Sequence, residues 1–273
     1  MSLRGASVPS EGAAAASLGQ LPRGQLGCRF LGVGGDGAAL GPTAVIEAGS
    51  RPLLQIDCPP GALNAHIDAY GATPRNLYVT HTHLDHIGGM EELFHGVIVD
   101  AENDPASRIR VFAHANIVPS LQQRLVANQY IRAEGGINFW DAFQLVPVSD
   151  GFWLEDHWFP VFEARHMQPH FCYGVALPGV FVYTGDTRPI PEVLARHAND
   201  DETVFHDCGL RANPAHTGFV DLLNEYPADL LNRIVCYHYG SETEAVRLEE
   251  HGFRVARAGQ RLVIPASANR AAA

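Results

Sequence analysis

The sequence predicts an α/β (α+β) fold in which two β-sheets pack face to face and helices cover their outer sides. Short apolar segments with strand character open the chain, and segments with helical spacing then alternate with further strands. The same order recurs in the second half of the chain. This pattern favours two packed sheets enclosed by helices, because each sheet must bury an apolar face.

The first half of the chain supplies one group of expected elements. Apolar runs bounded by glycine-containing turns predict strands at residues 28–33, 43–47, 53–57, 77–80 and 111–114. A short helix is expected over residues 64–69. A longer helix is expected over residues 118–133, where Leu121, Leu125 and Ile131 recur on one side.

The second half contains more strands. A second sheet is expected to include residues 143–148, 153–154, 158–164 and 173–177. Further strands are expected at residues 180–183, 203–205, 233–237 and 261–263, and helices at residues 192–198, 219–225 and 242–251. Because strand-end loops from both halves of such a sandwich meet along one edge, residues far apart in sequence can converge there.

Length and composition suit one folded domain. The 273 residues are 46% hydrophobic and 18% charged, which indicates a single domain over residues 25–265. Residues 1–24 and 266–273 are expected to be disordered tails, the first rich in Ala, Gly and Ser. No apolar run approaches the roughly 18 residues of a membrane helix, so no membrane partner is expected.

The cysteines and the charged residues narrow the class of protein further. The five cysteines include no CxxC pair, which favours a reducing cytoplasm and core positions for Cys58, Cys208 and Cys236. All 19 basic residues are arginine, which excludes a lysine nucleophile. The net charge of −11 argues against a large nucleic-acid partner. A small anionic substrate, such as a nucleotide, remains compatible because bound dications reverse the local field.

The most informative segment is His81-Thr82-His83-Leu84-Asp85-His86, which directly follows an expected strand. Imidazole and carboxylate groups suit zinc and its first-row neighbours. Four such side chains within six residues exceed what one ion takes from so short a segment, so two neighbouring ions are expected. His81 and His83 would bind one ion, and Asp85 and His86 the other.

This segment has the form of the HxHxDH signature of the metallo-β-lactamase superfamily, which the chain resembles. The resemblance implies a four-layer αββα sandwich and metal-dependent hydrolysis. His166, Asp186 and His238 each follow an expected strand and match the superfamily's later metal positions. The implied first site is formed by His81, His83, His166 and Asp186. The implied second site is formed by Asp85, His86, Asp186 and His238.

Two choices at this site stay open. His170 is an alternative to His166, from which it is only four residues away, or it faces the substrate. Zinc is expected, with manganese and iron as alternatives, because the same ligands serve all three. The remaining histidines are interpreted as solvated side chains, with His114 as a candidate second-layer contact. The solvated set comprises His66, His95, His157, His197 and His251.

Three further segments resemble the ribonuclease Z-like phosphodiesterase branch of the superfamily. They are Gly185-Asp186-Thr187-Arg188-Pro189, Val204-Phe205-His206-Asp207-Cys208 and Ala215-His216-Thr217. The resemblance implies that His216 acts on the scissile phosphate. Asp207 would hydrogen-bond His216, and Asp85 would orient the attacking water. Arg188 is either a phosphate contact or a structural ion pair, and His206 is a candidate support for a ligand histidine.

The chain also departs from ribonuclease Z. Only 19 residues separate His166 from Asp186, which leaves no room for the arm that grips tRNA. Asp207 stands where glutamate is usual. The expected substrate is therefore a smaller phosphodiester, such as a cyclic nucleotide or a short RNA end. A homodimer suits the family resemblance.

Two other functions remain compatible with the sequence. The first is hydrolysis of a lactone, thioester or β-lactam, with an acyl pocket lined by residues 139–143 and 153–159; His216 would then be dispensable. The second is a catalytically inactive, metal-binding member of the superfamily.

Overall fold

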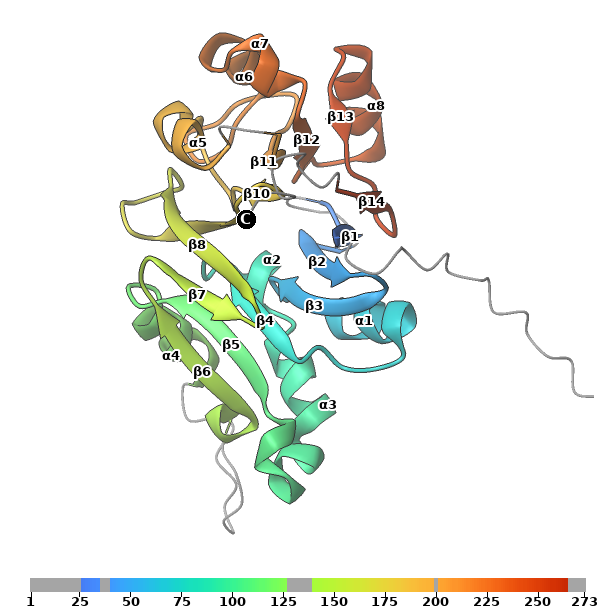
Figure 1. Ribbon diagram of the computed structural model, residues 1–273, viewed down its shortest axis with the longest axis vertical. Helices are drawn as coiled ribbons and strands as arrows, with labels where there is room; N and C mark the ends of the chain where they lie inside the picture. Colours follow the sequence, from blue (N-terminus) through green and yellow to red (C-terminus); the bar gives the residue numbers. More distant parts are fainter. Residues whose placement is uncertain (1–25, 35–39, 127–138, 199–200, 265–273) are drawn as a thin grey trace, which may run out of the picture.

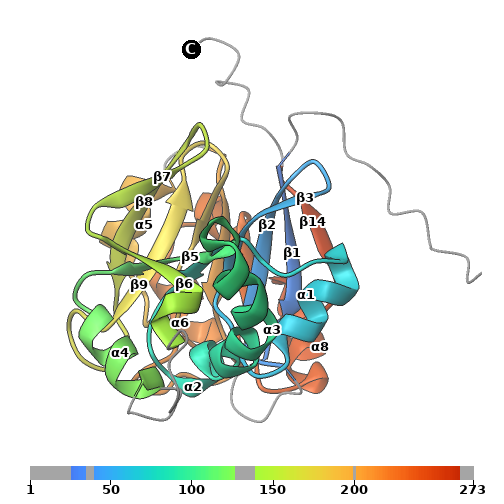
Figure 2. The same ribbon diagram turned by 90° about the horizontal axis from the view of Figure 1, so that it is seen from below.

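The computed structural model describes residues 26–34, 40–126, 139–198 and 201–264. Two seven-stranded sheets pack face to face, and helices cover both outer sides (Figure 1). The view from below shows the helices of the first half lying in front of their sheet (Figure 2). The predicted αββα arrangement is therefore confirmed. The two expected tails lie outside the described residues, as does the end of the helix expected over residues 118–133.

The first sheet has the strand order β14-β1-β2-β3-β4-β5-β6. Strands β1 to β3 are antiparallel neighbours, β3 to β6 are parallel, and β14 pairs antiparallel with β1. Its strands are β1 (Leu26–Gly32), β2 (Thr43–Ala48), β3 (Arg51–Ile56), β4 (Asn76–Val79), β5 (Ile109–His114), β6 (Phe143–Val148) and β14 (Arg261–Val263).

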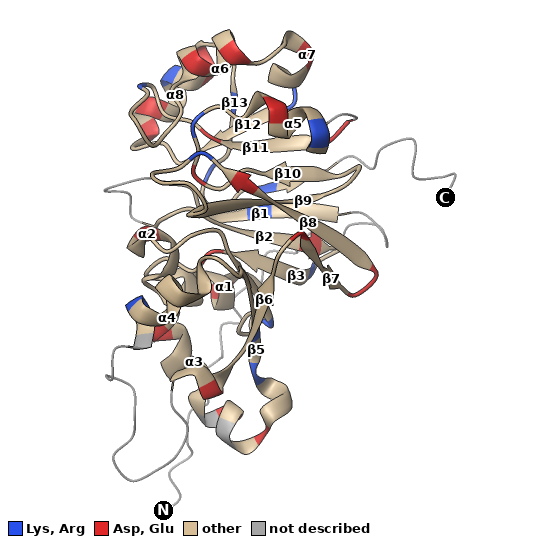
Figure 3. Ribbon diagram, turned by 90° about the vertical axis from the view of Figure 1, so that its left-hand side faces the viewer, with Lys and Arg blue, Asp and Glu red and all other residues tan. Residues whose placement is uncertain are grey.

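The second sheet has the order β13-β12-β11-β10-β9-β8-β7, antiparallel from β7 to β10 and parallel from β10 to β13. Figure 3 shows the two sheets stacked between the helical layers. Its strands are β7 (Gly151–Leu154), β8 (His157–Ala164), β9 (Cys172–Leu177), β10 (Phe181–Tyr183), β11 (Thr203–Asp207), β12 (Ile234–Tyr237) and β13 (Arg254–Val255).

The helices of the described chain are short. They are α1 (Ala62–Tyr70), α2 (Leu84–Ile87), α3 (Met90–Asn103), α4 (Val118–Val126), α5 (Pro191–His197), α6 (Phe219–Glu225), α7 (Ala228–Leu231) and α8 (Glu242–Glu250), with 3-10 turns at Pro105–Ser107 and Phe139–Ala142. Within the four described ranges, none combines the length and the apolar character needed to span a bilayer.

The sequence did not predict α3, the helix that covers the middle of the first sheet. Its run of β-branched residues, Val97-Ile98-Val99, has low intrinsic helix propensity. Packing overrides this preference, because Met90, Leu93, Phe94 and Val97 recur at helical spacing and are buried.

The assignment of residues 143–148 to the second sheet was wrong. They form β6, which pairs in parallel with β5 in the first sheet. A helix between two strands returns the chain to the same sheet in parallel, and α4 lies between these two. The second sheet therefore begins at β7.

The core lies between the sheets and is rich in aromatic rings. Phe30 of β1 meets Phe205 of β11 edge-on, with ring centroids 5.3 Å apart. Tyr78 of β4 is fully buried, and its hydroxyl donates across the core to the carbonyl of Tyr173, 3.1 Å away. Cys58, Cys208 and Cys236 are fully buried, as expected for core residues.

Candidate metal centre

The histidine-rich segment turns at the carboxyl end of β4. His81 and His83 lie on the extended chain, and His83 caps the single-turn helix α2, which carries Asp85 and His86. Gly89 lets this turn pack directly on the segment before α1, because a Cβ there would collide with the carbonyl of Pro59. The short helix thereby points Asp85 and His86 to the same edge as the two preceding histidines.

The later residues reach this edge from the second sheet. His166 follows β8, Asp186 follows β10, and His238 follows β12. His238 has a positive φ of 68°, an unfavourable backbone angle for a residue with a side chain. Its backbone N–H donates to the carbonyl of Val33, 2.7 Å away, which ties the strained residue to the end of β1. Such strain is typical of functional sites.

The structure brings all seven predicted ligands together in two groups that share Asp186. In each group the ligand atoms lie within 4.8 Å of one another; the groups are His81, His83, His166 and Asp186, and Asp85, His86, Asp186 and His238. Asp186 Oδ2 lies 3.2 Å from Nε2 of His86 and 3.2 Å from Nε2 of His238. His166 Nε2 lies 3.1 Å from His83 Nδ1.

These side chains fit two divalent cations. The Nε2 atoms of His81, His86 and His238 are buried and have no hydrogen-bond partner, and neither has either carboxylate oxygen of Asp186. Leaving buried polar atoms unpaired costs about 1–3 kcal/mol each. Here the unpaired atoms face one another, and mixed nitrogen and oxygen donors suit zinc, manganese or iron.

In His86 and His166, the ring nitrogen Nδ1 pairs with a group outside the ligand set, which fixes the orientation of the ring. His86 Nδ1 donates to Asp57 Oδ2 at 2.8 Å, and His166 Nδ1 lies 3.0 Å from the carbonyl of Ala215. Asp57 is fully buried, has a φ of 60°, and also accepts from the backbone and hydroxyl of Thr80. Partners of this kind set the tautomer and orientation of a ligand histidine.

Sequence reasoning missed the role of Asp57. The available signal was its position: it follows β3, the neighbour of β4, and so it reaches the same sheet edge as the histidine-rich segment.

Charges within the centre shift its pKa values in opposite directions. Burial, reinforced by His86, holds the pKa of His81 well below its ordinary value. Burial also disfavours charge on His86, but Asp186 and Asp57 outweigh it and raise the pKa of His86 to about 10. Burial acts to raise the pKa of Asp186, yet the surrounding histidines hold it well below its usual range.

His216 lies beside this centre, outside the two ligand groups that share Asp186; with Asp207 and His238 it forms a third cluster whose ligand atoms lie within 4.8 Å of one another. Its Nδ1 is 2.9 Å from Asp207 Oδ2, which also accepts from the backbone of Thr187. His216 Nδ1 is 4.0 Å from Asp186 Oδ2. Burial acts to lower the pKa of His216, but the hydrogen bond and charge of Asp207 raise it. The expected contact between His216 and Asp207 is therefore present.

The alternative residues lie elsewhere. His170 is exposed and pairs with Glu163 at 3.0 Å, so the structure places His166, and not His170, in the cluster. His206 contacts the hydroxyl of Tyr226 and the carbonyl of Asp207 and supports no ligand histidine. Arg188 forms a structural ion pair with Asp221 at 2.6 Å.

The interpretation of His66 as a solvated side chain was wrong. It is 1% exposed, and burial lowers its pKa to about 4. Its ring lies against Tyr70 on the inner face of α1, with the centroids 4.7 Å apart. His114 stacks on Tyr173 at 3.7 Å.

A cluster of histidines and aspartates at the edge of an αββα sandwich defines a metal-dependent hydrolase with the metallo-β-lactamase fold. The chain belongs to the family described as Anti-Pycsar protein Apyc1, whose family model matches residues 29–262. It is 27% identical over 241 residues to the Anti-Pycsar protein Apyc1 of Bacillus phage BSP38. That alignment covers 77% of this chain and 87% of the phage protein.

Solved structures agree on the fold. A diphosphatase of the PhnP family superposes with a TM-score of 0.69 at 15% identity, covering 87% of this chain and 96% of that one. The short form of human tRNase Z superposes with a TM-score of 0.60 at 14% identity, covering 88% and 99%. The predicted likeness to the ribonuclease Z-like branch is thus confirmed at the level of the fold.

We expect Asp186→Ala to lose bound metal at both sites and to lower hydrolytic activity by at least ~100-fold, because both ligand groups share this carboxylate. Metal content and activity are measured on the same purified sample. Asp229→Ala, which removes an exposed aspartate on α7, is the control. Retention of two ions by Asp186→Ala would contradict the bridging role.

We also expect metal binding at pH 7 to release protons. With its pKa raised to about 10, His86 is protonated in the metal-free protein, and it must lose that proton to bind an ion. Metal affinity should therefore fall as the pH falls. Titration calorimetry of Zn²⁺ binding in buffers of different ionisation enthalpy measures the proton count. Binding without proton release would show that the metal-free histidines are neutral.

Proposed function

We propose that the protein is a phosphodiesterase that uses two metal ions to hydrolyse a small phosphodiester. The observation that carries this proposal is His216, a partly exposed histidine paired with a buried carboxylate beside a complete set of metal ligands. Hydrolysis of an ester with a poor leaving group needs a proton donor at that position.

The predicted metal ligands form two groups, one for each proposed ion. His81, His83, His166 and Asp186 would hold one ion, and Asp85, His86, Asp186 and His238 the other. When bound, such ions supply Lewis acidity and a nucleophile at neutral pH. We propose zinc for both positions, since zinc is commonly held by histidine and carboxylate ligands.

His216 acts as the general acid in this proposal. Asp207 raises the pKa of His216, which favours its protonated form, while occupying Nδ1 and leaving Nε2 for the substrate. Water gives up one proton to solvent and its oxygen forms the new bond to phosphorus, the bond from phosphorus to the leaving oxygen breaks, and that oxygen takes the proton from Nε2. A proton from solvent then restores the protonated His216. Asp85, whose side chain is partly exposed, would orient the water.

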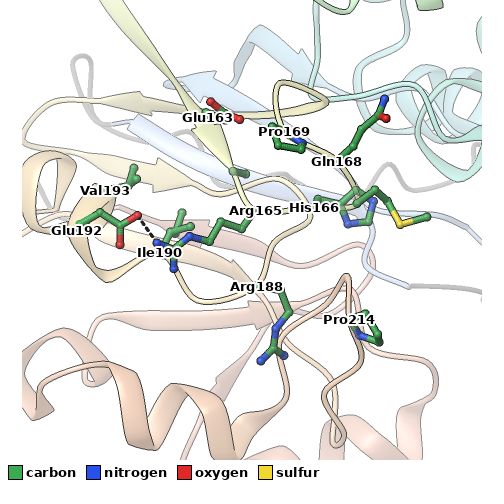
Figure 4. A pocket seen from close by; sticks show the side chains of 12 residues that line it. Glu163, Arg165, His166, Gln168, Pro169, Arg188, Ile190, Glu192, Val193 and Pro214 are labelled. Atoms are coloured by element: carbon green, nitrogen blue, oxygen red, sulfur yellow. Dashed lines mark hydrogen bonds and ion pairs between the residues drawn. The ribbon is translucent and has the colours of Figure 1, made fainter.

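A cavity of about 470 Å³ beside His166 would bind the part of the substrate that lies away from the reacting phosphate (Figure 4). Met167, Pro169, Ile190, Val193 and Pro214 give it apolar walls. Its two arginines are already paired with carboxylates, Arg165 with Glu192 at 2.8 Å and Arg188 with Asp221. The lining therefore favours an uncharged organic group over a second phosphate.

Other features also favour a small substrate. The segment between His166 and Asp186 consists of β9, β10 and their connections, with no protruding arm. Acidic residues gather on the outer helices α6 and α8, and arginines are scattered singly over the view of Figure 3. A long nucleic acid needs a continuous basic surface. We therefore favour a cyclic nucleotide or a short RNA end.

The phenylalanines of the two segments that could line an acyl pocket pack into the core, whereas Trp153 is exposed. Phe139 and Phe143 are buried against each other with ring centroids 5.0 Å apart, and Phe159 is fully buried against Phe152. They do not line the cavity beside His166.

We expect the purified protein to hydrolyse bis-nitrophenyl phosphate with about two metal ions per chain, and a chelator to abolish turnover. Activity and metal content are determined on one sample. Two bound ions without turnover would overturn the phosphodiesterase proposal and direct the search to lactones and thioesters.

We expect His216→Ala to keep both ions and to slow hydrolysis of an unactivated diester by ~10²–10⁴-fold, the usual contribution of a general acid. Nitrophenyl diesters should be much less affected, because a nitrophenolate leaves without a proton. His170→Ala, which removes an exposed histidine at the rim, is the matched control. Metal loss in His216→Ala would show that this histidine is a ligand.

A further inference from the structure

Arg188 links the metal centre to the loop that carries His216. It lies two residues after Asp186, and its backbone N–H donates to the carbonyl of Arg165, next to His166, at 2.7 Å. Its side-chain Nη1 donates to the carbonyl of His216 at 2.8 Å and to Asp221 Oδ2 at 2.6 Å. One residue therefore contacts the segment of a predicted metal ligand and the backbone of the proposed acid.

Four hydrogen bonds hold His216. Its backbone N–H donates to Asn213 Oδ1 at 2.9 Å, its carbonyl accepts from Arg188 at 2.8 Å and from the backbone N–H of Asn213 at 3.2 Å, and its Nδ1 pairs with Asp207. These contacts come from three different segments of the chain. They fix both the backbone and the ring of His216 and leave Nε2 as the one nitrogen directed to a substrate.

The ion pair between Arg188 and Asp221 also connects the loop that carries His216 to helix α6. Asp221 Oδ2 accepts from the backbone of Gly218 at 3.0 Å as well as from Arg188, at the point where α6 begins. Thr217 donates its hydroxyl to the carbonyl of Thr187 at 2.6 Å. The loop over residues 213–218 is thus fastened to the segment that contains Asp186.

We infer that Arg188 is a positioning residue. It holds His216 at a fixed position beside the metal centre and does not itself bind the phosphate. The inference rests on the proposed function, in which His216 donates the proton. A guanidinium suits this task, because one of its nitrogens can donate to a carbonyl and to a carboxylate together. Proton transfer requires hydrogen-bond distance, so a small shift of the loop removes it.

The test compares Arg188→Met with Arg233→Met. Arg233 is a matched control, because it is also partly buried and its side chain also donates to backbone carbonyls, those of Glu202 and Ala198, at the opposite end of the same sheet. Turnover is measured with 3′,5′-cyclic AMP, whose leaving oxygen needs a proton, and with bis-nitrophenyl phosphate, whose leaving group does not. Metal content is measured for each variant.

We expect Arg188→Met to keep its metal, to lower kcat for the cyclic nucleotide at least ~10-fold and to change that for the nitrophenyl diester less than ~3-fold. Adding His216→Ala should then cause no more loss than His216→Ala alone. Arg188→Lys should recover part of the activity. Equal loss on both substrates, or a loss that adds to that of His216→Ala, would overturn the inference.

A measurement without turnover separates this inference from the proposed function. The ring N–H shared by His216 and Asp207 is followed by proton NMR and assigned by its absence in His216→Ala. We expect Arg188→Met to lose or shift this resonance and Arg233→Met to keep it. An unchanged resonance would overturn the positioning role. A lost resonance in a protein that hydrolyses neither diester would uphold the positioning role and reject the phosphodiesterase proposal.

Discussion

The burial of one carboxylate among histidines is the constraint on which the rest of the structure depends. Asp186 is 1% exposed, and neither of its oxygens has a hydrogen-bond partner within the described chain. A buried charge without compensation costs several kcal/mol. Rings from β4, β8 and β12 must therefore meet at this point, which requires both sheets to present the same ends to one edge.

Hydrogen bonds from groups outside the ligand set hold the histidine rings in fixed orientations. Asp57 orients His86, and the carbonyl of Ala215 orients His166. Ala215, whose carbonyl orients His166, directly precedes His216. One stretch of backbone therefore orients a predicted metal ligand and carries the proposed acid.

The sequence was sufficient for the features that depend on local spacing. The segment from His81 to His86 was recognisable from its own spacing, and the resemblance to the superfamily then pointed to His166, Asp186 and His238 at later strand ends. Features that depend on distant contacts were not recognisable. Helix α3 carries β-branched residues that its packing overrides, β6 joins the first sheet through a crossover, and His66 is buried by its partner Tyr70. The roles of Asp57 and Asp221 depend on contacts with residues that lie tens of positions away in the sequence.

The pairing of β14 with β1 has a consequence for how the molecule is made. Strand β1 has an unpaired side until residues 261–263 are available, and Ile264 donates its backbone N–H to the carbonyl of Leu26. His238, needed for the second ligand group, is also supplied late. During synthesis from the amino end, most of the chain must wait on the ribosome before the sandwich closes. The second ligand group is therefore completed late in synthesis, and a product truncated before His238 would lack both that ligand and β14.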